Sequence, residues 1–325
     1  MSVVSEDATL KAAIGGDEAA FEQLIAPYLR ELRVHCYRMA GSLHEADDLM
    51  QESLLKIWKG LANFEGRASL RTWLYKLVTN VCLDALEKRA PRLLPTGLKP
   101  EDSDPLWLEP CPSSLYRAAE TSPAAHYENR QSIALAFLVA IQRLPAKQRA
   151  TLILREVLGF EATECAELLG LSVAAVNSAL QRARSTLSDW GAEQQVSPPT
   201  ADHSDLLRQY VRAWEQADVN ALVALLLKDA TLAMPPMPQW LSGAEAIGSS
   251  IQEMVFAPAG PGVFRLIQTE ANGAPAFAAY QRDSSSGEMR PMSIHVIEIA
   301  DGRIASITAF LDGWLFEAFD LPTVL

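Results

Sequence analysis

Residues 161–184 read EATECAELLGLSVAAVNSALQRAR and have the spacing of a helix-turn-helix. A small residue, Ala166, falls where the two helices would touch, and Gly170 falls in the turn. Val176 is placed to anchor the second helix, and Ser172 is suited to cap its first turn. The alternative is an ordinary helical hairpin with a glycine in its turn, whose second helix only packs against other parts of the protein.

The outward face of the second helix carries small and hydrogen-bonding side chains, which suit the major groove of DNA. The inward face is supplied by leucines, so the two faces are distinct. We therefore expect DNA to be contacted by Ser172, Ala175, Asn177, Ser178, Gln181, Arg182 and Arg184.

A chain of 325 residues suggests two or three domains, and its 49% hydrophobic and 21% charged residues are ordinary for a soluble globular protein. The longest apolar run, near residues 133–141, is far shorter than the roughly 18 residues of a membrane span. The first residues show no export signal, so we expect a cytoplasmic protein. The four cysteines show no CxxC pair or zinc-site spacing, so we expect neither a metal site nor a cofactor.

The net charge of −12 is unevenly distributed. Residues 17–90 hold ten basic and eleven acidic residues, residues 127–190 hold seven and six, and residues 200–325 hold seven and fifteen. A nearly neutral DNA-reading region gains little attraction to phosphate. We expect the protein to bind DNA weakly alone and to need a partner.

Residues 17–90 are predicted to form consecutive helices. Ser42 and Glu45 form a capping box that begins the helix HEADDLMQESLLKIWKGL. Along this helix a polar ridge has members three to four residues apart, hence side by side. An ordinary solvated helix face is the alternative to a partner-binding ridge. The ridge consists of Asp48, Gln51, Glu52 and Leu55.

Residues 63–89 mix cations with aromatic side chains, a combination that suits single-stranded nucleic acid because charges meet phosphates and rings meet unstacked bases. The alternative is that the apolar residues, Trp73 among them, form a core-facing stripe. The candidate binding residues are Phe64, Arg67, Arg71, Trp73, Tyr75 and Lys76.

In this order the blocks resemble a bacterial sigma factor of the extracytoplasmic-function (ECF) class, over about residues 15–90 and 127–190. DDLMQESLLKIWK resembles the region-two helix that grips the RNA polymerase clamp. NFEGRASLRTWLYKLVTNVCLDALEKR resembles the segment that melts the promoter and reads the minus-10 element. LPAKQRATLILREVLGFEATECAELLGLSVAAVNSALQRAR resembles region four, which reads the minus-35 element.

The resemblance implies roles for these residues. The polar ridge would contact the polymerase clamp, the segment Phe64–Lys76 would capture non-template bases, and the helix Ser172–Arg184 would read the minus-35 element. Gln148 and Arg149 correspond to the part that meets the polymerase flap. Where many members carry Lys and Arg in the recognition helix, this chain has Asn177 and Ala179, so base reading must depend on other side chains.

Residues 91–126 contain seven prolines and are predicted to be a linker. Its Trp107 and Leu108 are either an anchor that docks on another domain or an accident of sequence. A second, polar linker is expected over residues 191–202.

Residues 203–325 change from helix to strand. We expect helices at 206–215, 220–227 and 244–255, then antiparallel strands at 264–269, 276–282, 292–300 and 304–310, the last pair joined by Asp301-Gly302. This order resembles the SnoaL-like polyketide cyclase group of the nuclear-transport-factor superfamily, an α+β cone.

Catalysis in such a cone needs an inward-facing acid or base. His295 and Glu298 are three apart on one strand, hence on opposite faces, and no second carboxylate or histidine is evidently paired with either. We expect no enzymatic activity, and instead a role in sensing a small-molecule ligand or contacting protein.

The expected protein is thus multidomain. Two all-α sigma-like domains occupy residues 1–90 and 127–190, and the α+β domain occupies 203–325. Its function would be that of a sigma factor regulated in cis by its C-terminal domain, with core RNA polymerase and promoter DNA as partners. The alternative is a cone-fold enzyme fused to an autoregulatory DNA-binding module. The first is favoured because the ridge and melting segment are needed only for promoter initiation.

Overall fold

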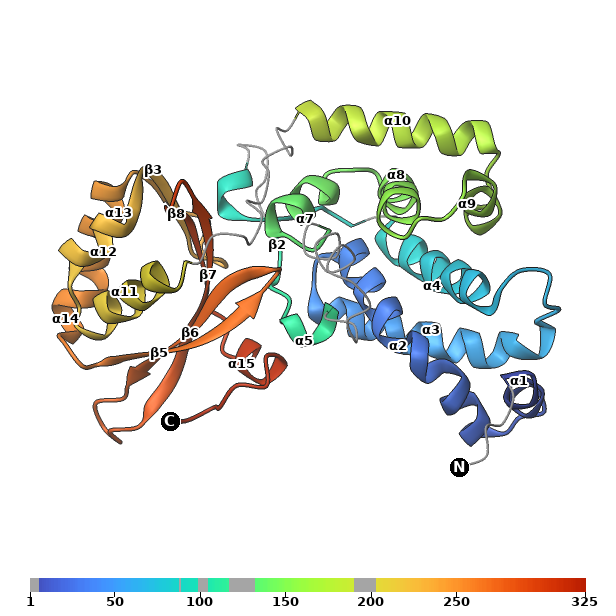
Figure 1. The fold of residues 1–325 in the computed structure, drawn as a ribbon, viewed down its shortest axis with the longest axis horizontal. Coiled ribbons are helices and arrows are strands. Elements are labelled where there is room, and N and C mark those ends of the chain that lie inside the picture. The colour runs from blue at the N-terminus through green and yellow to red at the C-terminus, as the bar shows by residue number, and fades with distance from the viewer. Residues whose placement is uncertain (1–5, 88, 99–104, 117–131, 190–202) are drawn as a thin grey trace. The chain divides into compact units, whose positions relative to one another are not determined.

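The computed structural model describes residues 6–87, 89–98, 105–116, 132–189 and 203–325 (Figure 1). These residues form two compact units. The first comprises Met1–Arg92, Leu115–Ser132 and Ala136–Glu193, and the second comprises Leu93–Ser114, Ile133–Leu135 and Gln194–Leu325. Part of the predicted proline-rich linker therefore belongs to the same unit as the C-terminal domain.

Four helices form the N-terminal part of the first unit: α1 (Glu6–Ile14), α2 (Glu18–Ala40), α3 (Leu43–Gly60) and α4 (Leu70–Leu86). Their ends follow local sequence signals. The Ser42 hydroxyl accepts a hydrogen bond from the Glu45 amide at 3.1 Å, which confirms the N-cap of α3. Gly41 adopts a left-handed conformation, with φ of 73°, and ends α2.

The remainder of the first unit is also helical. Its described part includes α7 (Leu135–Gln142), α8 (Ala146–Leu152), a π-helical turn (Ile153–Val157), α9 (Ala162–Leu169) and α10 (Val173–Asp189). Gly170, with φ of 62°, ends α9, and the Ser172 hydroxyl accepts a hydrogen bond from the Ala175 amide at 3.2 Å. The structure thus confirms the helix-turn-helix and both of its turn signals.

The second unit is built on a six-stranded sheet with the order β4-β3-β8-β7-β6-β5. Helices α11 (Ser204–Glu215), α12 (Val219–Leu225), α13 (Ala244–Ile251) and α14 (Ala257–Ala259) cover one face of it (Figure 1). Between sheet and helices lies an apolar core rich in aromatic rings, including Tyr210, Trp214, Phe256 and Phe277.

Four strands confirm the expectation for residues 264–310: β5 (Phe264–Ala271), β6 (Ala274–Arg282), β7 (Met289–Ala300) and β8 (Arg303–Phe310). Each pairs antiparallel with the next. Asp301 and Gly302 join the last two, with φ of 50° and 71°. Both positive angles are what a tight two-residue hairpin requires.

The sheet is larger than expected. Leu226–Ala233 and Trp240–Ser242 form β3 and β4, for which we expected a helix end and a proline-rich turn. β3 pairs parallel with β8, so the sheet is mixed and not purely antiparallel. The consecutive leucines 225–227 fit the periodicity of a helix or of a strand. Pairing with β8, which lies some 75 residues later in the chain, stabilises the strand.

The predicted linker contains short elements where it is described: β1 (Arg92–Leu93), a 3-10 turn (Pro95–Gly97), β2 (Leu106–Trp107) and α5 (Ser113–Tyr116). Leu108 is buried, and its amide donates to the Leu93 carbonyl at 2.9 Å. The apolar pair is therefore part of a packed unit. The second predicted linker lies outside the described residues. Within the described part of the chain, no helix is long and apolar enough to cross a membrane.

Candidate nucleic-acid interface

The polar ridge of α3 is exposed to solvent. Asp48, Gln51, Glu52 and Leu55 all face outward, and the apolar Leu55 is 61% exposed. The opposite face of the helix, with Leu49 and Ile57, is buried. Glu52 is paired with Lys56 at 2.9 Å one turn later. The helix thus offers a partner an acidic surface with a single apolar side chain, and which partner it meets remains a prediction.

The candidate melting residues differ in exposure. Arg67 and Lys76 are exposed, whereas Phe64, Arg71 and Trp73 are half-buried. Trp73 packs against Phe64, with ring centroids 5.3 Å apart, and joins a small cluster with Leu24 and Leu61. Much of the Trp73 side chain therefore packs against other apolar residues, as the core-facing alternative expects.

Tyr75 is completely buried in this structure. The Arg71 guanidinium lies 4.9 Å from the centre of its ring and 5.1 Å from the ring of Phe160. Arg71 also pairs with Glu31 at 3.1 Å. Burial raises the pKa of the Tyr75 phenol, so the ring stays neutral. These contacts join α4 to the residue that precedes α9.

The recognition helix α10 presents the expected face. Val176, Ala179, Leu180 and Ala183 are buried against the rest of the unit. The predicted DNA contacts are exposed, except for the half-buried Ala175. They are Ser172, Asn177, Ser178, Gln181, Arg182 and Arg184.

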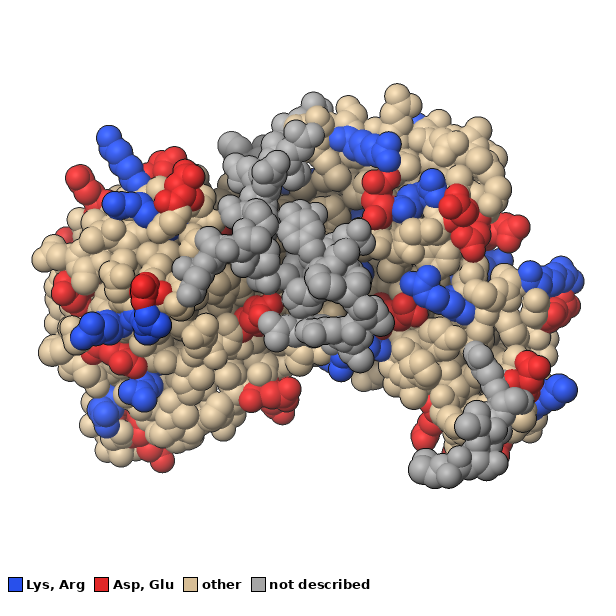
Figure 2. Space-filling view, viewed as in Figure 1, with Lys and Arg blue, Asp and Glu red and all other residues tan. Residues whose placement is uncertain are grey.

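The charge on this part of the surface is mixed. Arg184 pairs with Glu156 at 2.5 Å, which neutralises one of the cations of the helix. Figure 2 shows basic and acidic side chains interspersed over the visible face of α8, α9 and α10. A helix with this surface gains specificity from hydrogen bonds more than affinity from charge.

The two residues predicted to meet the polymerase flap lie on α8. Gln148 is half-buried, whereas Arg149 is buried. The Arg149 guanidinium donates to the carbonyls of Ile141, Gln142 and Leu144 at 2.7–3.3 Å, and to that of Met39. Burial lowers its pKa to about 10, so it remains a cation near pH 7. In this structure Arg149 caps the end of α7 and ties it to the end of α2.

The cone contains a buried chain of three hydrogen-bonded side chains that the sequence did not predict. Tyr210 Oη lies 2.8 Å from His295 Nδ1, and Ser293 Oγ lies 2.8 Å from His295 Nε2. All three residues are buried, and burial lowers the pKa of His295 to about 3. The imidazole is therefore neutral at physiological pH, and both of its nitrogens are occupied by neighbouring hydroxyls. The sequence signal for this contact is Tyr210, at the centre of the helix expected over residues 206–215.

Glu298 is separated from His295, as expected from their spacing. It accepts a hydrogen bond from Ser306 at 2.8 Å on the neighbouring strand β8. Among the described residues, no group of three or more His, Cys, Asp or Glu side chains is placed to hold a metal ion. All four cysteines are buried free thiols.

The linker is held by one side chain of the cone. Asn272 lies in the β5–β6 turn with φ of 53° and is 2% exposed. Its Oδ1 accepts from the Cys111 amide and its Nδ2 donates to the Ile133 carbonyl, both at 2.8 Å. The Asn272 amide donates to the Cys111 carbonyl at 2.9 Å. A single turn therefore binds the chain at both Cys111 and Ile133.

Comparison with protein families divides the chain in the same order. Residues 24–92 match Sigma-70 region 2, residues 134–187 match Sigma-70 region 4, and residues 207–307 match the SnoaL-like domain.

Relatives match over much of the chain. The ECF RNA polymerase sigma factor SigG of Mycobacterium tuberculosis is 44% identical over 313 residues, which cover 92% of this chain and 83% of SigG. SigM of the same species is 30% identical over 183 residues, covering 56% of this chain and 83% of SigM. The crystal structure of the M. tuberculosis ECF sigma factor SigJ shares the fold, with a TM-score of 0.60 and 23% identity, over 92% of this chain and 99% of SigJ.

Proposed function

Because this chain belongs to the ECF sigma factors, which bind core RNA polymerase and direct it to promoters, we propose that α3 and α10 carry its two principal contacts. The ridge of Asp48, Gln51, Glu52 and Leu55 binds the polymerase clamp. The exposed face of α10 reads the minus-35 element. The observation that supports this assignment is that both helices bury one face and present a polar face outward. The protein acts in the cytoplasm, where polymerase and promoters meet.

Loss of the ridge charges tests the clamp assignment. The exposed Asp48 and Glu52 contribute little to folding, so Asp48→Ala with Glu52→Ala should leave the melting temperature nearly unchanged. Affinity for core polymerase, measured by fluorescence anisotropy, should fall about tenfold or more. The control is Glu18→Ala with Glu22→Ala, an exposed acidic pair on α2. A ridge variant that binds polymerase as tightly as the parent would refute the clamp assignment.

We propose that the SnoaL-like domain regulates initiation in cis. The support is that Asn272 hydrogen-bonds to Cys111 and Ile133, because both residues lie in the chain between the region 2 and region 4 matches. A tethered domain needs only weak contacts, since its effective concentration is about millimolar. Any ligand of the cone would act by favouring one arrangement of the linker.

Promoter-specific transcription by the full chain and by a chain ending near Gln195 tests the regulation. Regulation in cis predicts a change in initiation at equal polymerase affinity, in the direction of inhibition or of activation. Equal initiation and equal polymerase affinity would remove the hypothesis.

A cone-fold enzyme remains the second candidate, and the buried chain of Tyr210, His295 and Ser293 is the observation that bears on it. A histidine whose pKa is lowered to about 3 is a weak base and is not an acid at pH 7. Its nitrogens are already paired within the core. We therefore propose that the hydrogen-bonded side chains of Tyr210, His295 and Ser293 stabilise the cone and perform no catalysis. A His295→Gln variant that keeps full transcription and its regulation is the expected result.

A further inference from the structure

Arg71 and Tyr75 on α4 together have the chemistry of a stacking site for an unpaired base. A planar guanidinium lies 4.9 Å from the centre of an aromatic ring. Bases of single-stranded nucleic acid stack on aromatic rings and on arginine planes, with little regard to sequence. Glu31 fixes the orientation of the guanidinium through contacts of 3.1–3.3 Å.

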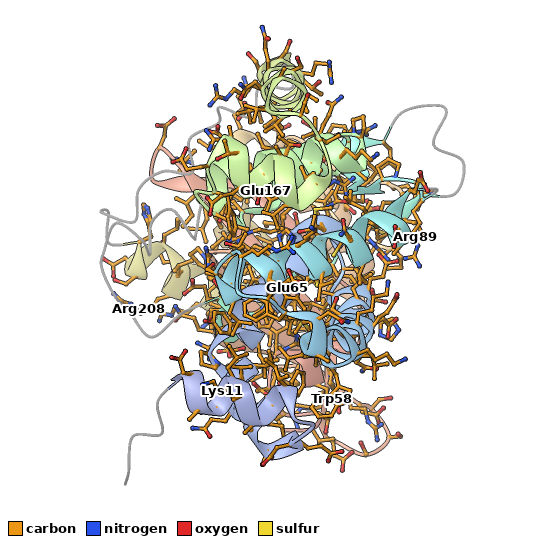
Figure 3. The ribbon with its side chains drawn as sticks, turned by 90° about the vertical axis from the view of Figure 1, so that its right-hand side faces the viewer. Lys11, Trp58, Glu65, Arg89, Glu167 and Arg208 are labelled. Carbon is orange, nitrogen blue, oxygen red and sulfur yellow. The ribbon has the colours of Figure 1, made fainter. Side chains whose placement is uncertain are left out.

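In this structure that site is occupied by another part of the chain. The Phe160 ring lies 5.2 Å from the Tyr75 ring, at an interplanar angle of 68°, and 5.1 Å from the Arg71 guanidinium. Phe160 is only 4% exposed and precedes α9 by two residues. Figure 3 shows α9 beside α4. Glu167 marks α9 in that view, and Glu65 marks the loop before α4.

We propose that Phe160 takes the place of an unpaired promoter base on Arg71 and Tyr75, so that the helix-turn-helix and single-stranded DNA compete for the same face of α4. The inference rests on the promoter-melting role expected for residues 64–76, and it adds a reason why Tyr75 is covered in this structure. Region four must leave α4 before Tyr75 can meet a base.

A second set of contacts holds the same closed arrangement. Gln142 Nε2 donates to the carbonyls of Arg38 and Met39 at 3.2 and 3.4 Å, and Arg149 also donates to Met39. These carbonyls belong to the last turn of α2, where backbone acceptors lack helical partners and the helix dipole is negative. Opening the arrangement must therefore also break these hydrogen bonds, which polymerase binding can compensate.

Binding of a short single-stranded oligonucleotide of about ten bases to the full-length protein, without polymerase, tests the competition. Phe160→Leu keeps a buried apolar side chain but removes the ring, and we expect it to tighten binding about fivefold or more. Phe316→Leu is the matched control, because that buried ring packs edge-on against Tyr280 in the C-terminal unit instead. Circular dichroism and thermal melting verify the fold of both variants.

Gln142→Leu provides an independent variant, since it weakens the second set of contacts and leaves Phe160 and Arg71 in place. It should also tighten oligonucleotide binding. Adding Arg71→Ala to Phe160→Leu should cancel the gain. Unchanged or weaker binding by folded Phe160→Leu or Gln142→Leu overturns the inference.

The melting role itself is measured separately. Arg71→Ala is compared with the parent in transcription by core polymerase from a duplex promoter and from one with an unpaired minus-10 region. If Arg71→Ala initiated normally on the duplex, the melting role would be lost. The oligonucleotide result would still show whether Phe160 covers a site for single-stranded DNA.

Discussion

Among the described residues, each unit buries one histidine in its neutral form, and this makes stability depend on pH. His35 Nε2 lies 2.9 Å from Thr79 Oγ1, and His295 contacts two hydroxyls. Burial lowers both pKa values to about 3, and the charges of Arg38 and Arg71 add to the effect at His35. In the unfolded chain a histidine takes up a proton near pH 6.5. Between about pH 6.5 and 3 the unfolded state therefore binds more protons, and stability falls as pH falls.

His295→Gln should flatten this dependence for the C-terminal unit. Each buried histidine contributes a slope of at most about 1.4 kcal/mol per pH unit, and glutamine does not titrate. The measurement is the free energy of urea unfolding of the full chain between pH 4 and 7, followed by hydrogen exchange in β6 and β7. The exposed His44→Gln is the control. A His295→Gln profile as steep as that of the parent would contradict the assignment.

Residue types alone could not distinguish contact residues from buried ones. Tyr75 was assigned to nucleic acid because aromatic rings among cations suit unpaired bases, and Arg149 was assigned to polymerase through the resemblance to region four. The structure buries both of them, because Phe160 covers the tyrosine and backbone carbonyls of α2 and α7 surround the arginine. Those partners are distant in sequence, so no local pattern could reveal them.

At the scale of elements, the sequence predicted those helix ends that depend on interactions within one turn of the chain. The caps at Ser42 and Ser172 and the glycine at 170 lie within a turn of the helices they end or begin, and the structure confirms all three. β3 depends instead on pairing with β8, and it was missed. Tyr210 and His295 likewise meet only because α11 packs on the sheet. The exposed faces of the helices were therefore predictable from the sequence, and the contacts within the cores were not.

The β5–β6 hairpin turn offers a test of the linker attachment, because one substitution separates its backbone role from its side-chain role. Glycine adopts positive φ without strain, so Asn272→Gly keeps the turn and removes both buried side-chain hydrogen bonds. Each bond contributes about 0.5–1.5 kcal/mol. We expect faster hydrogen exchange around Cys111 and Ile133, with little change in the exchange of β7 and β8.

The matched control for this substitution is Asp301→Gly, because Asp301 occupies a comparable position, also at positive φ, in the β7–β8 hairpin. It should leave exchange in the linker unchanged. Equal protection of Cys111 and Ile133 in Asn272→Gly and in the parent would show that Asn272 does not hold the linker. Altered transcription by Asn272→Gly, absent from the control, would connect the attachment to regulation.

At the scale of the whole molecule, the distribution of charge determines how the protein finds DNA. The −12 net charge lies mostly in residues 200–325, and the DNA-reading blocks are close to neutral. Arg184 is further neutralised by Glu156. Few phosphates can therefore be neutralised, and few counterions released, when the free protein meets duplex DNA. Promoter recognition must draw its affinity from the complex with polymerase.

The salt dependence of duplex binding measures this directly. For the free protein we expect weak binding to promoter DNA and a shallow decline of log K with log salt, because the slope follows the number of phosphates contacted. Glu156→Gln removes the partner of Arg184, and it should tighten binding at low salt and steepen the slope by about one. Glu18→Gln, a similar change of charge on α2, controls for net charge alone. A steep slope in the parent, or an equal response of the two variants, would mean that phosphate attraction is supplied by a surface other than α10.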